Sequence, residues 1–401
     1  MFKIKPQKTR MKGSLMGIVL LICLICAIVG TGLLALAFHS RMLGIRAGDE
    51  ITARLAADAA VANAIFQLNE KLKVKPWDDS SLPTASTVSL LNSDATFDYT
   101  VSNAGGVYTI TGTGRGVRTS RVVESTLRLY SPFDYAVLTR SSLELKSSAT
   151  VDWYNNQADD WPLQIGTTST ASGAITLLSN TTVNGDIVVG AGGDPASVIS
   201  SSGTITGNIY PMISNPELPT ITVPDWLAAM SSGGVIKKES SFVTGKFSGM
   251  TLGTNDTITI TEPIVLYITG DITLGNSAII EIGGATDTDN NASLIIYLAG
   301  NLEGKYSSGF NNLTMDAKRL YIYGLDSCTS IALKNSADFR GAIYAPNAAV
   351  DLDNSGNIYG SVVSDSFVLR NSAVVYYDAN LRDRTVNDEA VRFVIHRWSE
   401  R

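Results

Sequence analysis

One seven-residue pattern recurs near the end of the chain, in Leu333-Lys-Asn-Ser-Ala-Asp-Phe339, Leu352-Asp-Asn-Ser-Gly-Asn-Ile358 and Leu369-Arg-Asn-Ser-Ala-Val-Val375. Each copy has an aliphatic residue, then Asn and Ser, a small residue, and a second apolar residue at its end. The spacing of these copies, from 333 to 352 to 369, is the size of one coil of a β-solenoid. Each coil of such a fold exposes strand edges that only a neighbouring coil can satisfy. The pattern therefore predicts a stack of short, similar coils.

Looser copies of the pattern occur earlier in the chain. They are Leu145-Lys-Ser-Ser-Ala-Thr-Val151, Ile199-Ser-Ser-Ser-Gly-Thr-Ile205, Leu274-Gly-Asn-Ser-Ala-Ile-Ile280 and, one residue shorter, Leu178-Ser-Asn-Thr-Thr-Val183. We expect the apolar residues of each copy to point inward and to stack in rows. Asn tolerates the left-handed backbone of a sharp corner, and stacked Asn side chains can bond from coil to coil. The expected corner residues are Asn276, Asn335, Asn354 and Asn371.

The copies define a long β-rich head. The stretch from Leu274 to Leu333 is long enough for roughly three coils of the later size. An antiparallel β-sandwich with similar turns is the alternative, but a sandwich does not require the same turn repeatedly. We predict a parallel β-helix over residues 133–380, in which the proline-containing segment 209–240 is an insertion or a lid. The charged segment at residues 381–401 is predicted to be a C-terminal cap on the stack or a tail.

An uncharged apolar run lies near the N-terminus, over residues 15–38, with the sequence LMGIVLLICLICAIVGTGLLALAF. About 20 apolar residues are enough to cross the core of a bilayer. The basic segment 1–13 precedes the run, and the positive-inside rule keeps such a segment in the cytoplasm. A cleaved secretory signal is the alternative, since Ala35-Leu36-Ala37 offers a cleavage site. The run is longer than the apolar part of most such signals, which favours a membrane-spanning helix.

The helical pattern continues beyond the apolar run. Residues 41–75 lack proline, and the alanine-rich segment 55–64 strongly favours helix. Pro76 ends the pattern, so residues 14–76 are predicted to form one membrane-spanning and then amphipathic helix. Residues 77–132 then alternate apolar and polar side chains around two glycine-rich turns, which predicts a β-meander of about three strands. Helix and meander together make a small α+β unit, in a chain that is otherwise mainly β.

Charge excludes several classes of function. Residues 1–40 carry five basic and no acidic side chains, a net of +5, so a whole-chain net of −6 leaves −11 for the remainder. So acidic a head argues against a nucleic-acid partner. His39 and His396 are the only histidines, which gives little support to a Ser/His/Asp site. Cys23, Cys26 and Cys328 offer no disulfide framework. We expect a non-catalytic protein without a cofactor.

Acidic groups in the head are the candidates for catalytic or metal-binding residues, because solenoids can host glycan-degrading enzymes. The candidates are Asp159-Asp160, Asp351 with Asp353, and Asp287, Asp289 and Asn291. The last group resembles the start of a calcium loop, but Ala292 stands where that loop needs glycine. We therefore expect a solvated polar turn and no metal site.

The N-terminal part of the chain resembles a known family. Lys12-Gly13-Ser14 followed by the apolar run, and the AADAAVANA segment at 56–64, resemble the start of PilX-type minor pilins. In that family a peptidase cuts after the glycine, and the apolar helix packs into a filament or its base. The resemblance places the cut between Gly13 and Ser14. Pilins commonly carry Glu at the fifth mature position, where this sequence has Ile18.

The head resembles the β-helical domain that follows PilX-type anchors. The matching segments are Phe133-Asp-Tyr-Ala-Val137, Gly341-Ala-Ile-Tyr-Ala-Pro-Asn347 and Arg397-Trp-Ser-Glu400. The two resemblances imply a structural component of a type IV pilus or of a type II secretion-like assembly. They imply a single-pass protein of the bacterial inner membrane, with the head in the periplasm or outside the cell. The implied partners are other pilin-like subunits or assembly-platform proteins, contacted through the helix.

Two other functions fit the sequence. The head can act as an adhesive or carbohydrate-binding solenoid, for which Trp153, Tyr154 and Trp161 are the aromatic residues available to stack on sugars. A polysaccharide-degrading β-helix enzyme is the less favoured alternative.

Overall fold

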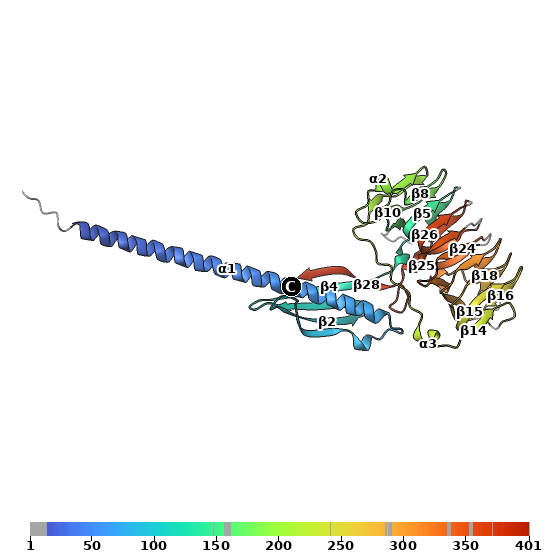
Figure 1. Cartoon of the computed structure of the whole chain (residues 1–401), viewed down its shortest axis with the longest axis horizontal. Coiled ribbons are helices and arrows are strands. Elements are labelled where there is room, and N and C mark those ends of the chain that lie inside the picture. Colours follow the sequence, from blue (N-terminus) through green and yellow to red (C-terminus); the bar gives the residue numbers. More distant parts are fainter. Residues whose placement is uncertain are drawn as a thin grey trace, which may run out of the picture. The chain divides into compact units, whose positions relative to one another are not determined.

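The computed structural model describes residues 14–146, 148–155, 162–240, 242–284, 287, 291–334, 338–352, 356–370 and 372–400. The chain forms two compact units (Figure 1). The helix–sheet unit comprises Met1–Leu68, Asp78–Arg128 and Ile395–Arg401, and the solenoid unit comprises Asn69–Trp77 and Leu129–Val394. The fold is mainly β, with one long apolar N-terminal helix and a stack of parallel strands, as the sequence predicts.

A single helix, α1 (Ser14–Leu72), runs for 59 residues, about 90 Å at 1.5 Å per residue. The glycines at positions 30, 32, 44 and 48 do not interrupt it. It ends four residues before Pro76, in a turn at Lys73, because the residue before a proline disfavours helix.

The second half of α1 packs on an antiparallel sheet. The strands are β1 (Thr84–Ser89), β2 (Thr96–Ala104), β3 (Val107–Arg115), β4 (Ser120–Tyr130) and β28 (Arg392–Glu400), in the order β1-β2-β3-β4-β28. The predicted meander within 77–132 is therefore present. The tail, predicted to be a cap or a tail, divides between the units: its first part belongs to the solenoid unit, whereas β28 extends this sheet and does not cover the end of the coils. An added strand satisfies the exposed edge of β4 by hydrogen bonding.

Alanine and glycine bring α1 unusually close to the sheet. The helix buries one stripe of small side chains. They are Ala53, Ala56, Ala57, Ala60 and Ala64, all without exposed surface. Facing them, β3 has glycine at the alternate positions 112 and 114. A methyl group added at Gly114 would lie 2.0 Å from the backbone oxygen of Ala53 and 2.3 Å from the backbone nitrogen of Ala57. The strand thus contacts the helix backbone directly.

The solenoid unit is built from two series of parallel coils. The first series contains β5 (Val137–Leu145), β6 (Thr150–Trp153), β7 (Gln164–Thr167), β8 (Ile175–Leu177), β9 (Thr182–Val183), β10 (Asp186–Val189), β11 (Ile199–Ser201), β12 (Thr204–Ile205) and β13 (Ile209–Pro211). The second contains β14 (Gly233–Ile236), β15 (Gly245–Leu252), β16 (Thr257–Ile260), β17 (Pro263–Ile268), β18 (Ile272–Leu274), β19 (Ile279–Ile282), β20 (Ser293–Leu298), β21 (Leu302–Gly304), β22 (Gly309–Asn312), β23 (Leu320–Gly324), β24 (Ser330–Leu333), β25 (Phe339–Leu352), β26 (Ile358–Leu369) and β27 (Val374–Tyr377).

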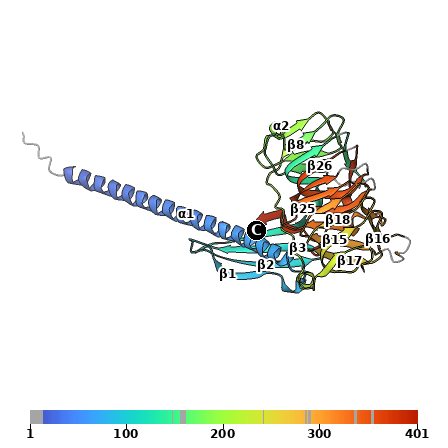
Figure 2. The ribbon, with the colours of Figure 1, turned by 45° about the vertical axis from the view of Figure 1, so that its right-hand side comes forward.

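The order of the coils in space differs from their order in sequence. The last long strand, β26, pairs in parallel with the first, β5, so that Leu369 aligns with Leu145. Likewise β27 pairs with β6, aligning Val375 with Val151. β26 accordingly lies beside β5 in Figure 1 and near β8 in Figure 2. The first series therefore grows away from a central junction, and the second series grows back toward it.

The segment between β13 and β14 connects the two ends of the stack. The predicted insertion or lid at 209–240 is therefore a return connection, because β13 pairs with β10 whereas β14 pairs with β15. Part of this segment covers an apolar outer face of the coils. That face carries a ladder of tyrosines on successive strands, Tyr267, Tyr297, Tyr323 and Tyr344. Tyr344 donates a hydrogen bond to the backbone oxygen of Pro219, 2.7 Å away, so the connection is fixed to the ladder.

Two inward rows run along the stack, as the pattern predicts. The first position of each copy aligns in one buried row: Leu252, Leu274, Gly304, Leu333, Leu352, Leu369, Leu145 and Leu177. In the last coil of the first series the aligned residue is Ser201, which is exposed. Six positions later, Ile280 aligns with Phe310 and Phe339 with Ile358. The rows reveal two copies that the pattern missed, at 252–258 and 304–310. Hence 274 to 333 spans two coils and not three.

Two early copies were placed in the wrong register. The copy at Leu178 begins one residue earlier, at buried Leu177, and has full length, whereas Leu178 is 40% exposed. Ile199 aligns with Ile175, which lies two residues before Leu177. Ile199 is therefore not the first position of its copy. The registers differ because the coils vary in length, from a short one between 352 and 369 to a long one between 145 and 177. The connecting loops vary, while the corner turn is constant.

The corner residue is not the expected one. In the copy at Leu274, the left-handed residue is Ser277 (φ 54°) and not Asn276. Ser148 and Ser372 take the same position (φ 63° and 59°). The corner closes with a hydrogen bond from Ala278 N to Gly275 O of 3.1 Å, a type II pattern whose third residue needs positive φ. Asn335, Asn354 and Asn371 lie outside the described residues.

Backbone groups bond one corner to the next coil. Asn255 N donates to Asn276 O (2.8 Å), and Ser277 N donates to Tyr306 O (2.9 Å). The bonds from coil to coil at this corner are therefore made by the main chain, and the expected ladder of Asn side chains is not their source. A positive φ turns the N–H of this residue along the stack, where a neighbouring carbonyl accepts it.

Candidate functional site

The first half of α1 is the largest candidate surface. Within the described residues, α1 is the one helix long and apolar enough to span a membrane, and none of its apolar window is buried. Its large side chains are exposed on every side, including Ile18 at 52% and Leu36 at 68%. Thr31, the polar residue in the middle of the run, donates its hydroxyl proton to the carbonyl oxygen of Ala27, 2.9 Å away. So continuous an apolar surface requires an apolar environment.

Of the two predicted processing residues, Ser14 is the first residue of α1, and Gly13 lies outside the described residues. The position that carries Glu in most pilins, Ile18, is part of the exposed apolar surface.

The helix–sheet unit has a second candidate feature at the other end of the exposed segment. Asp49 accepts three hydrogen bonds from the β3–β4 loop: Val117 N at 2.7 Å, Arg118 N at 2.8 Å and Thr119 Oγ1 at 2.9 Å. Desolvation acts to raise the pKa of Asp49, but hydrogen bonds from Arg118, Thr119 and Val117 outweigh it and lower that pKa. A charged Asp49 thus fastens this loop to α1.

The three predicted carbohydrate contacts do not form one platform. Trp153 contacts Tyr377 (ring centres 5.6 Å apart) and is covered by the Arg382 guanidinium at 5.1 Å. Tyr154 belongs to another group, with Tyr359 at 5.0 Å. Trp161 lies outside the described residues. The alternation of side chains along a strand separates Trp153 from Tyr154.

The aromatic group around Tyr154 was not foreseen from the sequence. Tyr154 is 39% exposed, and Tyr359 stacks on Tyr376 with ring centres 5.0 Å apart. The guanidinium of Arg340 lies 3.9 Å from the Tyr359 ring centre and 5.1 Å from that of Tyr154. Arg340 is 6% exposed, and its buried Nη1 has no hydrogen-bond partner among the described residues. Aligned positions on successive coils create this ladder of arginine and tyrosine.

The acidic candidates make no cluster in the described part of the chain. Asp351 pairs with Arg370 at 2.9 Å. Asp287 accepts backbone hydrogen bonds from Asn291 (3.1 Å) and Ala292 (3.2 Å), so it closes its own turn. Asp159, Asp160, Asp289 and Asp353 lie outside the described residues. No group of three or more His, Cys, Asp or Glu with metal-binding geometry occurs among the residues described.

A polar cleft of about 320 Å³ lies beneath the return connection. Its polar side chains bond to one another: Arg140 Nη1 donates to Asn347 Oδ1 (2.5 Å), and Asn347 Nδ2 donates to Asp326 Oδ1 (3.2 Å). Asn347 belongs to the segment at 341–347 that supports the resemblance of the head. Because these groups satisfy one another, the cleft holds two loops together.

A buried titratable pair lies under the last residues of the solenoid unit. Burial lowers the pKa of Lys75, whose Nζ donates to the backbone oxygens of Val386 and Asp388. Burial also raises the pKa of Glu389, which accepts a hydrogen bond of 3.2 Å from the hydroxyl of Tyr297. These bonds fix the segment 386–389 on the tyrosine ladder.

Comparisons with known proteins found similarities over parts of the chain. A family model described as a domain of unknown function (DUF7305) matches residues 247–384, within the solenoid unit. No curated protein matches. Among solved structures, the competence-associated pilin ComZ from Thermus thermophilus is similar at 12% identity and a TM-score of 0.26, over 88% of this chain and 97% of that one. A glycosylated ice-binding protein (LeIBP) from an Arctic yeast is similar at 15% identity and a TM-score of 0.26, over 61% of this chain and 91% of that one.

An ice-binding protein from an Antarctic bacterium, Flavobacteriaceae, is similar at 13% identity and a TM-score of 0.21, over 61% of this chain and 79% of that one. At these scores the likenesses carry no functional argument.

Proposed function

We propose that this protein is a membrane-anchored, non-catalytic structural subunit of a type IV pilus or a type II secretion-like assembly, of the PilX-type minor pilin or pseudopilin class. The observation that carries the proposal is the division of α1. Its first half exposes apolar side chains on every side, and its second half buries an alanine stripe on an antiparallel sheet. One continuous helix thereby joins a segment suited to an apolar environment to a folded sheet.

The exposed half of α1 matches the requirements of a membrane. An α-helix satisfies the hydrogen bonds of its own backbone N–H and C=O groups. This is necessary in a membrane, because lipid tails offer those groups no partner. Residues 15–38 contain no charged side chain, and a helix of that length spans about 36 Å, slightly more than the core of a bilayer. The basic segment before the run favours a cytoplasmic N-terminus and a head outside the cytoplasm.

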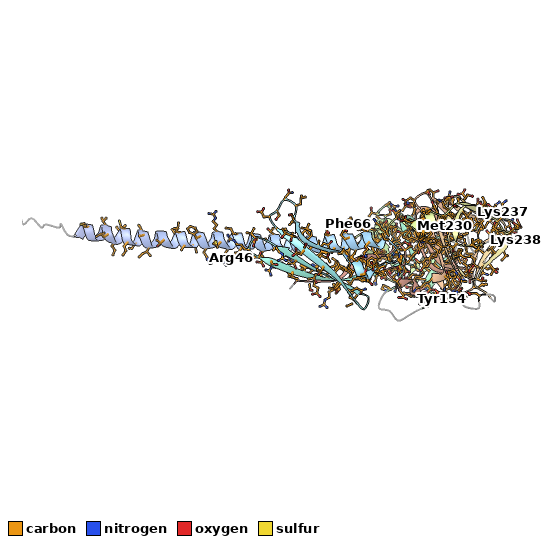
Figure 3. The ribbon with its side chains drawn as sticks, turned by 90° about the horizontal axis from the view of Figure 1, so that it is seen from below. Arg46, Phe66, Tyr154, Met230, Lys237 and Lys238 are labelled. Atoms are coloured by element: carbon orange, nitrogen blue, oxygen red, sulfur yellow. The ribbon has the colours of Figure 1, made fainter. Side chains whose placement is uncertain are left out.

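The helix also offers a surface to other helices. Beyond the apolar run, Ile51, Leu55 and Phe66 remain exposed at 61%, 56% and 57% on the side of α1 away from the sheet. Phe66 extends from the helix in Figure 3. Their spacing of four and eleven positions places them on one face. Partners with apolar helices, such as other pilin-like subunits or an assembly platform, fit this face.

The mature N-terminus tests the proposal. Mass spectrometry of the membrane-extracted protein should show a chain that begins at Ser14. Gly13→Val should block that cleavage and leave the full leader, whereas Gly17→Ala, inside the first turn of the helix, should not. A chain that begins at Phe38 and stays soluble would refute the membrane anchor. An intact N-terminus in the membrane fraction would refute the pilin-type processing and leave the anchor standing.

A second candidate function is binding of a surface glycan by the head. The ladder of Tyr154, Tyr359 and Tyr376 favours it, since aromatic faces with a nearby guanidinium suit sugar rings. Glycan-array binding by the full chain should be lost in Tyr154→Ala and retained in Trp153→Ala, because Arg382 covers Trp153. Loss in neither variant, or in both equally, would contradict a site at Tyr154.

A further inference from the structure

Two loops of the helix–sheet unit lie at the same level of α1. Asp49 fastens Val117 and Arg118 to the helix through the hydrogen bonds described above. The β1–β2 loop reaches the same level, because Ser93–Ala95, Gly116–Arg118 and residues 45–52 of α1 line one cleft of about 450 Å³. This end of the sheet points toward the apolar run, since Gly114 packs at Ala53 and Gly112 packs farther along, at Ala57.

Both loops expose large apolar side chains. Leu91 is 87% exposed and Val117 is 75% exposed. The hydrogen bonds to Asp49 restrain the backbone of the β3–β4 loop, and this restrained loop exposes the aliphatic side chain of Val117 to solvent. Ile45, on α1 beside the same cleft, is also exposed at 43%. The loops and the helix thus form a rim that exposes several large apolar side chains, an arrangement unfavourable in water.

The rim lies close to the end of the apolar run. Along a helix, Asp49 is about 16 Å beyond Phe38 but only about 6 Å beyond the apolar Ile45. The headgroup layer adds roughly 5 to 7 Å to each side of the bilayer core. Transmembrane helices tilt by about 20° on average, and a tilt toward the sheet lowers the loops further. Measured from Phe38, the rim lies above the headgroup layer. It reaches the headgroups when the exposed apolar segment from Met42 to Ile45 enters the lipid and Arg41 extends its guanidinium back to the surface.

The charges beside the rim have a small positive excess. Arg41, Arg46 and Arg118 are exposed, and their guanidinium groups form no ion pair in the described part of the chain. Arg46 lies on α1 next to the sheet in Figure 3. The acidic groups that face the rim are Asp49, whose carboxylate accepts the hydrogen bonds of the β3–β4 loop, Asp94, which is exposed, and Glu50, which pairs with Arg121. Anionic lipid attracts such a cluster over about one Debye length, ~8 Å at physiological salt.

We propose that this rim, formed by Leu91, Val117, Arg46 and Arg118, docks on the anionic surface of the membrane that α1 crosses. The aliphatic side chains enter the headgroup layer, and the arginines pair with lipid phosphate. Docking fixes the tilt of α1 and with it the direction of the helix–sheet unit. The inference rests on the proposed membrane anchor, which supplies the surface.

The test uses the full chain with Cys23→Ala and Cys26→Ala, reconstituted in phosphatidylcholine vesicles with or without phosphatidylglycerol. A polarity-sensitive fluorophore is attached at Val117→Cys. The matched control is Val107→Cys, at the opposite end of β3 and 51% exposed. With phosphatidylglycerol present, emission at 117 should shift to the blue and be quenched by headgroup spin labels, while emission at 107 should match water. Arg118→Gln and Arg46→Gln should each lower the equilibrium constant for docking about fivefold, the effect of one basic residue near an anionic surface.

A third label, at Leu20→Cys, reports whether α1 is in lipid. If the label at 20 is in lipid and the labels at 117 and 107 are equally exposed to water, the docking proposal fails and the anchor stands. If the label at 20 is in water, both proposals fail. If the shift at 117 depends on the ratio of protein to lipid and not on phosphatidylglycerol, the rim contacts another protein, which overturns docking on lipid.

Discussion

Replacing Gly114 by alanine should separate α1 from its sheet. The new methyl group would lie 2.0 Å from the backbone oxygen of Ala53, whereas ordinary van der Waals contact begins at 3.4 Å, so strand and helix must move apart. The obstructing atoms belong to the helix backbone and cannot rotate away. Overpacking of this kind costs about 1 to 3 kcal/mol, and we expect Gly114→Ala to reach the upper end of that range.

Hydrogen exchange is the suitable assay, because a chain with two units and an apolar helix does not unfold in one step. A loss of about 3 kcal/mol corresponds to exchange about 100-fold faster in β3 and in residues 53–64 of α1. Gly112→Ala should change exchange less, since its nearest neighbours would be 3.0 Å away. Thr113→Ala, whose side chain is on the other side of β3, serves as the control. Equal protection in Gly114→Ala and wild type, or an equal loss in Thr113→Ala, would refute the packing argument.

Three further predictions concern other parts of the molecule. Hydrogen bonds from Thr87 N and the Arg115 side chain lower the pKa of Asp98, so its contribution to stability is present above its ordinary pKa and is lost as pH falls through the lowered value. Asp98→Asn should lower the stability of the sheet by about 0.5 to 1 kcal/mol at pH 7, and hydrogen exchange in β2 at pH about 3 should show the difference shrink. Ser277 has φ 54°, so Ser277→Val should destabilise its corner by about 1 to 3 kcal/mol, measured as faster hydrogen exchange there, while Ser277→Gly should be neutral or stabilising; a neutral valine variant would contradict the turn. Phe367 is fully buried at the junction, aligned with Leu143, so Phe367→Ala should cost about 3 to 5 kcal/mol and speed exchange in both β26 and β5; a loss confined to β26 would argue against their pairing.

The fold class followed from the sequence because its signals are local. A long apolar run without proline predicts one helix, and a repeated corner predicts stacked coils. The order of the coils could not be predicted in this way. Each copy requires a neighbour with the same shape, and Leu145 fits Leu369 as well as it fits Leu177.

Other differences arise where a small residue replaces the expected one. Gly304 occupies a position that is leucine in most coils, so an apolar pattern passes over that copy. The glycines of β3 resemble a turn signal in the sequence, but two of them provide close contact with α1. At the corner of 274–280, Asn276 is conspicuous in the sequence, but Ser277 after it adopts positive φ.

Surface sites were the least predictable feature. Trp153 and Tyr154 are adjacent in sequence, and each packs with an aromatic residue of the last coils, Tyr377 and Tyr359. Arg340 joins Tyr154 and Tyr359 only because the junction brings the last coils onto the first. Such a ladder depends on tertiary register, for which the sequence has no local signal.

The most direct test of the account is the position of the chain in a cell membrane. A membrane-impermeant maleimide should label Ser93→Cys in intact spheroplasts, without labelling Lys5→Cys in a Gly13→Val background until the membrane is permeabilised. That result would place α1 across the membrane, with the leader inside and the head outside. Labelling of both cysteines in intact spheroplasts, or release of the unprocessed protein in soluble form, would contradict the claim that α1 anchors the head.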